Sequence, residues 1–433
     1  MRHERGSALI AVLLLLMMMS ALAATLAVSG RTETLVVRNH ETSAQALAAA
    51  EAGLNHAVQV AVAYLAEIDP DNISTALDTL LADPSDLDID LNTTIAIAGA
   101  ADADAAYEVS VMDEDDPARG ATGLTAASIG EDDVATTDNN DTLVIRATGH
   151  ASNNTTVTLE ALISPMAYGA LVTDGDLTIS GNVSIDGADG SGSVHSNGDI
   201  TISGGSTDIS GSITASGEYT GSASGSGGMP KLPLPKIEAI DYKDHADFIL
   251  KPNGTMTNQA GTVLCTWSSK VKCNNWSFSS TTTGWTIGSG TSTVSSGTYY
   301  VEGTGGATVS GSPGSSASPV HISIIAEGSI NVSGSPDFVP EDSTNILFVT
   351  DGDLEISGGL DTGDSLTTQG RILVHEQIKF SGNPSLNGQV IVENAEDVFT
   401  LVHTNAVSGH VEITYNGGLS SNVFHVSGWR EIR

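Results

Sequence analysis

The chain has 433 residues, enough for two or three domains, and its 52 acidic against 16 basic residues give a formal net charge of -36. A surface this acidic repels nucleic acid and anionic lipid headgroups, which excludes a nucleic-acid-binding protein and a basic peripheral membrane protein. Hydrophobic residues still make up 40% of the chain, so it is not a disordered acidic tail, and its 47 glycines favour many short strands joined by turns.

An apolar segment near the start of the chain is long enough to cross a bilayer. Residues 8–28 contain no Asp, Glu, Lys, Arg or Pro, and Arg2 and Arg5 precede them. By the positive-inside rule these arginines stay in the cytoplasm and the rest of the chain is delivered outward. Apolar residues then recur at helical spacing as far as Leu65, which predicts one long helix over residues 7–65 with a lipid-soluble first half and an amphipathic second half.

Three interpretations of this segment compete. It is a secretory signal cut after Ala23, an uncleaved membrane anchor, or a prepilin-type leader of residues 1–6 cut between Gly6 and Ser7. The amphipathic continuation of the helix favours the third interpretation, because a soluble secreted protein has no use for such a helix, whereas a helical filament has.

Two short motifs carry a family resemblance. Residues 5–10 (Arg-Gly-Ser-Ala-Leu-Ile) with the apolar segment, and residues 48–54 (Ala-Ala-Ala-Glu-Ala-Gly-Leu), resemble the N-terminus of PilX-type minor pilins of type IV pilus assembly. The resemblance implies that prepilin peptidase cleaves after Gly6 and that Ser7 becomes the new N-terminus. It also implies a single-pass inner-membrane subunit that later joins other pilins and the pilus assembly machinery at the cell surface. The residues expected in the membrane and then in the filament core include Ala8, Leu13, Leu16, Leu22 and Val28.

One position departs from the pattern of major pilins. Those proteins usually carry a glutamate five residues into the mature chain, where it offsets the N-terminal ammonium of the next subunit, because a lone buried charge is costly. Counted from Ser7, that position is Ala11. The missing glutamate indicates either a place at the filament tip or in a priming complex, or drift within a minor family.

Residues 66–165 fit a small pilin-like β domain. Apolar residues alternate over residues 107–112, 142–147 and 156–163, and Asn153-Asn154 is a good hairpin turn between the last two. We therefore expect an antiparallel sheet packed on the amphipathic half of the long helix.

A repeated pattern follows, typified by Gly-Asp-Leu-x-Ile-Ser-Gly. Its copies end at glycines 181, 204, 311, 334, 358 and 382, and four of the five gaps are 23 or 24 residues long. Because alternate residues of each copy are apolar, stacked copies would enclose an aliphatic interior. The repeat predicts a parallel β-helix over residues 166–433, with an insertion at about 210–300. These coils, and the ending that includes residues 415–419 and 429–431, also look like the C-terminal halves of large PilX-like proteins.

The expected insertion contains both cysteines and three of the four tryptophans. Cys265 and Cys273 lie eight positions apart in a segment delivered to an oxidising compartment, so we expect them to form a disulfide. Trp267, Trp276 and Trp285 either contact a sugar or a receptor or form a small local core around the disulfide.

No motif indicates catalysis, and no cofactor or metal is expected. The chain has neither a glycine-rich loop followed by Lys-Ser/Thr nor His-Glu-x-x-His, and no histidine or third cysteine lies at ligand spacing from the two cysteines. The acidic clusters at residues 113–116 and 131–133 lack EF-hand spacing, which favours solvated loops over Ca²⁺ sites. Only Lys379 and Arg371 lie among the regular repeats as basic candidates for a polysaccharide-cleaving site.

The combined expectation is a mainly β, non-enzymatic protein. A long N-terminal pilin helix with a small antiparallel sheet precedes the β-helix. The expected function is that of a minor pilin that assists pilus assembly or priming and presents the β-helix for adhesion to a carbohydrate or other surface ligand. Two alternatives stay open: a secreted or surface β-helix protein that binds or cleaves polysaccharide, and a self-polymerising structural scaffold.

Overall fold

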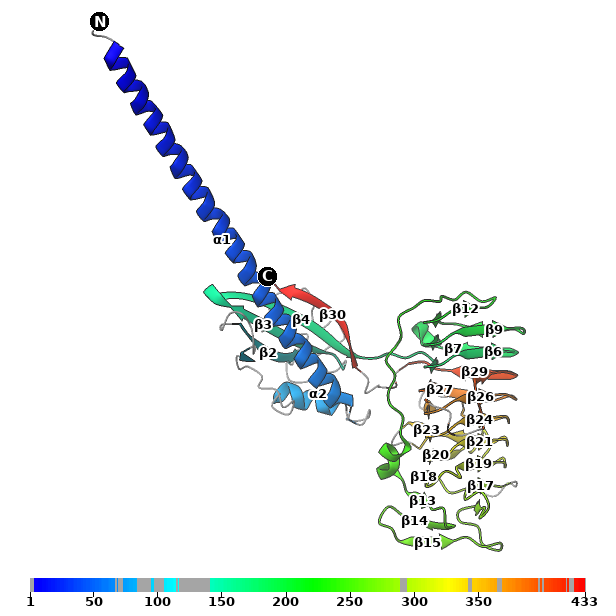
Figure 1. Cartoon of the computed structure of the whole chain (residues 1–433). Coiled ribbons are helices and arrows are strands. Elements are labelled where there is room, and N and C mark those ends of the chain that lie inside the picture. The colour runs from blue at the N-terminus through cyan, green and yellow to red at the C-terminus, as the bar shows by residue number, and fades with distance from the viewer. Residues whose placement is uncertain are drawn as a thin grey trace. The chain divides into compact units, whose positions relative to one another are not determined.

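The chain divides into two compact units in the computed structural model (Figure 1). Unit 1 comprises Met1–Met166 and Phe424–Arg433, and unit 2 comprises Ala167–Val423. The structure describes residues 4–66, 68, 73–83, 95–96, 105–113, 116, 141–288, 294–341, 345–363, 368–395, 398, 401–417, 419 and 424–432.

Unit 1 is built on the long helix α1 (Glu4–Ala66), which has 63 residues. At ~1.5 Å per residue it is about 95 Å long. The sequence contains no proline before Pro70, so nothing breaks the helical hydrogen bonds earlier. The long helix predicted over residues 7–65 is therefore present. A short helix, α2 (Ile73–Ala82), follows and contributes Leu77 and Leu80 to the same core as the end of α1.

An antiparallel sheet packs on the second half of α1, in the strand order β1-β2-β3-β4-β30. Its strands are β1 (Ile95–Ala96), β2 (Ala106–Asp113), β3 (Leu143–Ala151), β4 (Thr155–Pro165) and β30 (Phe424–Ile432). The turn between β3 and β4 is the short 3-10 helix η4 (Ser152–Asn154), where Asn153 and Asn154 adopt φ of 62° and 56°. Asparagine tolerates this left-handed region, so the predicted turn at Asn153-Asn154 is confirmed.

The last strand, β30, corrects the predicted domain boundary. β30 pairs antiparallel with β4, with Phe424 opposite Pro165, and so belongs to unit 1. The prediction that the repeated domain extends over residues 166–433 is wrong at its C-terminal end. An alternating strand pattern specifies which face is buried but does not specify the partner strand, which here is distant in sequence.

Unit 2 consists mainly of short strands, and its described residues form two sheets of 15 and 10 strands. The larger sheet contains β5 (Leu171–Thr173), β7 (Asn182–Asp186), β8 (Val194–Ser196), β10 (Asp208–Ile209), β11 (Ile213–Ala215), β13 (Phe248–Leu250), β14 (Thr255–Thr257), β15 (Val263–Thr266), β18 (Gly297–Val301), β20 (Val320–Ala326), β22 (Phe338–Val339), β23 (Ile346–Thr350), β25 (Gly370–Val374), β27 (Ser385–Val392) and β29 (His410–Thr414). The smaller sheet contains β6 (Leu177–Ser180), β9 (Ile200–Ser203), β12 (Tyr219–Thr220), β16 (Trp276–Phe278), β17 (Trp285–Ile287), β19 (Ala307–Val309), β21 (Ile330–Val332), β24 (Leu354–Ile356), β26 (Ile378–Phe380) and β28 (Asn405–Val407). Two 3-10 helices, η5 (Ala188–Gly190) and η6 (Ala239–His245), lie in the connections.

The six copies of the sequence repeat lie in the smaller sheet, on β6, β9, β19, β21, β24 and β26. Pairing is parallel, with Ile330 opposite Leu354 and Leu354 opposite Ile378, each 24 positions further along the chain. Ile356 is fully buried while its neighbour Glu355 is half-buried, as the alternation predicts. The inward residues of both sheets form one continuous, mainly aliphatic core.

The strands do not stack in chain order. The smaller sheet runs β12-β9-β6-β28-β26-β24-β21-β19-β17-β16, so its N-terminal strands adjoin its C-terminal strands (Figure 1). Residues 171–220 add layers toward one end of the stack, and the chain then passes along the stack to its other end. From there residues 248–414 form layers that return toward the first group. The two groups meet where β27, β28 and β29 pair with β5, β6 and β7.

This reversal explains the 107-residue gap between the two groups of repeats. The insertion predicted at about 210–300 is therefore too wide, because residues at both ends of that range pair in parallel with the repeated layers. β11 and β12 pair in parallel with β8 and β9, and β13 and β17 pair in parallel with β18 and β19. Only residues 229–247, named here the crossing segment, run outside the sheets from one group of layers to the other.

Candidate functional site

The first half of α1 exposes a continuous apolar surface. Every large hydrophobic side chain from Leu9 to Val37 is between 50% and 70% exposed, including Leu13, Leu16, Leu22 and Val28 from the predicted set. By length and composition the helix is able to cross a membrane. Gly6, Ser7 and Ala8 lie in the first turns of α1, and their side chains are outside what the structure describes.

The motif of residues 48–54 lies where α1 packs on the sheet. Ala50 is fully buried and Glu51 is exposed, which gives this part of the helix one inward face. A side chain at Gly53 would come within 2.6 Å of the Tyr107 ring, and one at Gly149 of β3 would collide with the backbone of Ala50. The small residues of the motif therefore have a structural cause, because they allow α1 to lie directly on β2 and β3.

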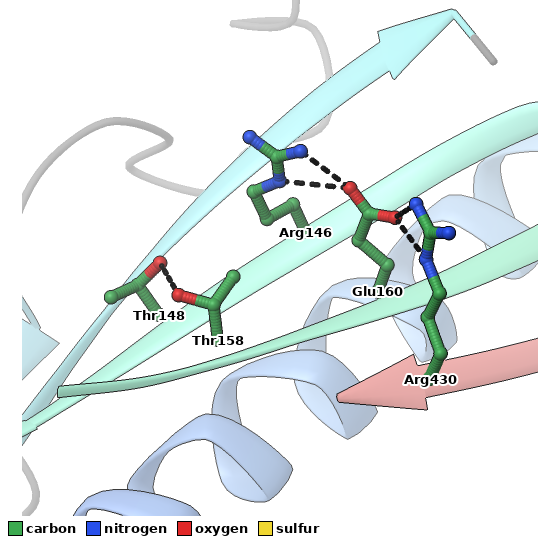
Figure 2. Close-up of polar contacts among 5 residues, drawn as sticks. All are labelled: Arg146, Thr148, Thr158, Glu160 and Arg430. Carbon is green, nitrogen blue, oxygen red and sulfur yellow. Dashed lines mark hydrogen bonds and ion pairs between the residues drawn. The ribbon is translucent and has the colours of Figure 1, made fainter. Parts of the chain in front are cut away.

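A buried carboxylate on the other face of this sheet is bound by two arginines (Figure 2). Glu160 of β4 is fully buried. Arg146 of β3 donates from Nε and Nη2 to Glu160 Oε1 at 3.0 and 2.5 Å. Arg430 of β30 donates from Nε and Nη2 to Glu160 Oε2 at 3.0 and 2.8 Å. Because both carboxylate oxygens are engaged, we name these three residues the Glu160 clamp, which joins strands β3, β4 and β30.

The Glu160 clamp was missed at the level of sequence. The sequence signal for it was Glu160, a glutamate within the apolar strand pattern of residues 156–163. Alternation alone assigns this glutamate to a solvent-facing position. Its second arginine comes from 270 positions further along the chain, on a strand whose partner was not predicted.

The aromatic residues of unit 2 form a core, and the ligand-contact interpretation is wrong for Trp276 and Trp285. Both indole rings are fully buried, so neither can stack on a sugar from solvent. Trp276 packs 5.4 Å from Tyr299, and Trp285 packs 5.3 Å from Phe278, measured between ring centroids. The alternative of a core position is thus correct for these two rings, but they belong to the continuous core of unit 2 rather than to a small separate core around the disulfide.

Trp267 and the two cysteines complete this end of the stack. Trp267 is half-buried and meets the edge of Phe278 at 6.0 Å. Cys265 and Cys273 form the expected disulfide, with their Cα atoms 5.7 Å apart.

A row of polar side chains follows the ends of successive strands in the larger sheet. The row consists of Glu302, Glu327, Asp351, His375 and Glu393, whose backbone amides each bond to the preceding layer. The crossing segment binds along this row. Ile237 N donates to Glu393 Oε2 at 2.9 Å, Ala239 N donates to Asp351 Oδ1 at 2.5 Å, and Lys243 Nζ lies 3.0 Å from Glu302 Oε1.

A pocket of about 350 Å³ lies between the crossing segment and this row. It is lined by Ile237, Glu238, Ile240, Asp351, His375, Glu376 and Val398. Burial raises the pKa of Asp351, and it raises the pKa of the neighbouring Asp353 to about 6 although backbone amides of Gln377, Leu401 and Val402 donate to that carboxylate.

The described residues contain no group of three or more His, Cys, Asp or Glu side chains placed to hold a metal ion. Of the predicted acidic loops, Asp113 ends β2 and is fully buried, so the prediction of a solvated loop is wrong for this residue. Asp116 is half-buried, while residues 114–115 and 131–133 lie outside the described part of the chain.

Comparison with known proteins leaves the family open. No protein-family model matches the chain, and no curated protein matches it. Among solved structures, the crystal structure of the competence-associated pilin ComZ from Thermus thermophilus matches with a TM-score of 0.28 and 12% sequence identity. That match covers 90% of this chain and 98% of the ComZ chain. A score of that size does not establish a common fold.

Proposed function

We propose that the chain is a minor-pilin-like subunit of a type IV pilus. In this proposal it is made as a single-pass inner-membrane protein, and prepilin peptidase cleaves it between Gly6 and Ser7. The apolar half of α1 is held in the membrane and later packs among the helices of other pilins in the filament core. The role is assembly and presentation rather than catalysis, and it requires no cofactor.

The observation that carries the proposal is the contrast between the two halves of α1. The half up to Val37 is exposed on all sides, whereas the half from Thr42 is buried on one side against an antiparallel sheet. An apolar surface of this extent needs a bilayer or a bundle of like helices to cover it. A subunit that moves from membrane to filament meets both environments in turn.

Unit 2 is, in this proposal, a parallel β-helix that the pilus presents for adhesion or for the initiation of assembly. Supporting observations are the parallel pairing at intervals of 24 residues and the single interior core. Ala11 at the position of the usual glutamate agrees with a place at the tip or in a priming complex, where no subunit ahead supplies an ammonium.

The covered end of the stack favours a presented module over a self-polymerising scaffold. Open strand edges would be needed at both ends for polymerisation. At one end residues 221–228 fold back over the last layer, where Ser226 N donates to Ile213 O at 2.9 Å. At the other end the parallel stack gives way to the antiparallel hairpin of β14 and β15, whose strand β15 remains an edge of the larger sheet.

The polysaccharide-cleaving alternative loses one of its two basic candidates. Arg371 is buried, with 6% of its surface exposed, so it is not available to a polymer bound on the outer face of the sheet. Lys379 is exposed, but its Nζ lies 2.7 Å from Glu355 Oε1. The alternative would therefore depend on a single lysine that already pairs with a carboxylate.

The proposal is tested by two variants that separate the routes of processing. Gly6→Val is expected to block maturation and leave a slightly larger membrane-bound form, because prepilin peptidase requires the small leader residue. Ala23→Val is the matched control, because it disables only the signal-peptidase alternative and is expected to mature normally. Normal maturation of the Gly6 variant together with blocked maturation of the Ala23 variant would contradict the proposal.

A further inference from the structure

One segment of unit 2 has a charge opposite to that of the whole chain. Residues 248–301 contain no Asp or Glu, but they contain Lys251, Lys270 and Lys272, in a chain of net charge -36. These residues form strands β13 to β18 at one end of the stack, where β15 is the outermost strand of the larger sheet.

The outermost part of this segment is a rigid hairpin, residues 263–273, named here the disulfide hairpin. Ser268 and Val271 exchange backbone hydrogen bonds of 3.1 and 3.0 Å at its turn. The bond between Cys265 and Cys273 closes its neck. The conformation of the turn is thus fixed before any partner arrives, which lowers the entropic cost of binding.

The disulfide hairpin exposes aliphatic side chains beside its lysines. Val263 is 58% exposed, and Leu264 and Val271 are each 48% exposed. Lys270 and Lys272 are exposed on the same hairpin. Leu264 and Lys272 each adjoin a cysteine of the disulfide, so the apolar and basic groups lie close together.

The acidic polar row lies too far away to cancel this local charge. Glu302, which begins the polar row, follows β18, and β15 is separated from β18 by β13 and β14. Three strand spacings of ~4.8 Å amount to about 14 Å, against a Debye length of about 8 Å at physiological salt. Asp244 and Asp247 are nearer, but both lie toward the end of β15 away from Lys270. Asp244 Oδ1 accepts a bond from Gln259 in the β14–β15 turn, and Asp247 precedes the end of β13 where Ile249 lies opposite Thr257.

The presence of both lysines and exposed aliphatic side chains on the disulfide hairpin indicates which class of partner it fits. A hydrated polysaccharide or a nucleic acid is bound by cations with aromatic stacking. Trp276 and Trp285 are buried, and Trp267 of the hairpin is half-buried against Phe278 and the core of unit 2. A bilayer with anionic headgroups uses both features, because lysines meet its phosphates and aliphatic side chains enter the acyl boundary.

We propose that the disulfide hairpin docks on a lipid bilayer that carries anionic headgroups, with Lys270 and Lys272 at the phosphates and Val263, Leu264 and Val271 in the acyl boundary. The overall charge excludes a basic peripheral membrane protein, but it is an average over the chain and does not describe this end of unit 2. The inference rests on the proposed function in one respect: the pilus is taken to present unit 2, and the bilayer is the surface that unit 2 then meets.

The test must keep the apolar half of α1 from binding the probe bilayer. The full chain is therefore held by α1 in nanodiscs of phosphatidylcholine and passed over supported bilayers of phosphatidylcholine alone or with phosphatidylglycerol. Surface plasmon resonance is expected to show binding only where phosphatidylglycerol is present, and weaker binding at higher salt. If the chain binds neither bilayer, the proposal is wrong. The lysines would then serve only to prevent other strands from pairing with the exposed edge strand.

Two double variants separate the parts of the contact. Lys270→Gln with Lys272→Gln is expected to weaken binding by about 25-fold, at about fivefold for each lysine. Leu264→Ser with Val271→Ser is expected to weaken it by a similar factor. The matched controls, Lys231→Gln and Leu401→Ser, change an exposed lysine and an exposed aliphatic residue elsewhere in unit 2 and are expected to bind as the parent does.

Soluble anionic polymers provide the contrary outcome. If duplex DNA or alginate binds as tightly as the bilayer, and the aliphatic double variant binds as the parent does, the partner is a charged polymer and the proposal is wrong. Because the assay uses purified chain, its result does not depend on cleavage after Gly6. Failure here leaves the pilin proposal standing, and failure of the Gly6 experiment leaves this one standing.

Discussion

Unit 1 and unit 2 are both sheet proteins, yet they bury their strands against different partners. In unit 1 one antiparallel sheet packs on a single helix, and the Glu160 clamp ties its last strand to the others. In unit 2 most strands pair in parallel with the corresponding strand of the next layer, and the layers enclose their own interior. A unit held by a few specific ion pairs is expected to unfold locally when one ion pair is lost. In a stack of similar layers, the loss of a contact in one layer is expected to destabilise the neighbouring layers as well.

The largest expected effect is on the Glu160 clamp. Glu160→Ala leaves two arginines without their common carboxylate, and loss of one member of a buried ion pair costs about 3–5 kcal/mol. Hydrogen exchange measured by mass spectrometry is expected to show faster exchange in β4 and β30. Thr158→Ala, on the same strand and face, removes only the hydrogen bond to Thr148 and is expected to cost about 1 kcal/mol. Equal effects of the two variants would mean that the clamp does not hold β30.

The core of unit 2 gives the next largest effect. Ile356→Ala, at a fully buried position of β24, is expected to cost about 2–5 kcal/mol through the cavity it leaves. Because β24 lies between β21 and β26, exchange is expected to rise on both neighbours as well. The outward-facing Glu355→Ala on the same strand is the control. Faster exchange confined to β24 would contradict the cooperative stack.

Removal of the disulfide has a smaller and more local effect. Cys265→Ser with Cys273→Ser opens a loop of eight residues, which costs about 2–3 kcal/mol on the loop-entropy model. Proteolysis is expected to nick the disulfide hairpin first, while the layers from β18 onward stay protected. Unfolding of the whole stack in this variant would show that the hairpin nucleates unit 2 rather than only closing its end.

The smallest effect is a dependence of stability on pH. Burial raises the pKa of Asp353 from 3.8 to about 6, so the folded state binds this proton more tightly than the unfolded state does. Its contribution to stability therefore increases as the pH falls through 6 and is lost as the pH rises. From pH 7 to pH 5.5 this group adds about 0.8 kcal/mol. Thermal unfolding of Asp353→Asn should show a flatter pH profile than the parent, and an unchanged slope would exclude Asp353 as the source.

Local signals predicted the elements whose causes are local. Apolar residues at helical spacing as far as Leu65 predicted α1, the Asn153-Asn154 pair predicted the β3–β4 turn, and alternation within each repeat predicted its strand. In each case the relevant physics acts within a few residues of the chain.

Strand pairing and side-chain contacts between segments that are distant in the sequence could not be predicted in the same way. Similar repeats offer similar edges, so β6 accepts β28 on one side as readily as β9 on the other, and the sequence does not specify the direction of stacking. Likewise, the charge of Glu160 reads as solvent-facing until β30 brings Arg430 to it. The burial of Trp276 and Trp285 depends on the layers above and below them, which composition does not reveal.

The most direct test of the pilin account is the mature N-terminus, measured by mass spectrometry on protein from membrane fractions and from sheared surface fractions. The account predicts a chain that begins at Ser7 in both fractions, because α1 must keep its apolar half to enter a filament. A chain that begins at Ala24 would contradict it, since the segment that spans the membrane would then be lost and unit 2 would belong to an ordinary secreted protein.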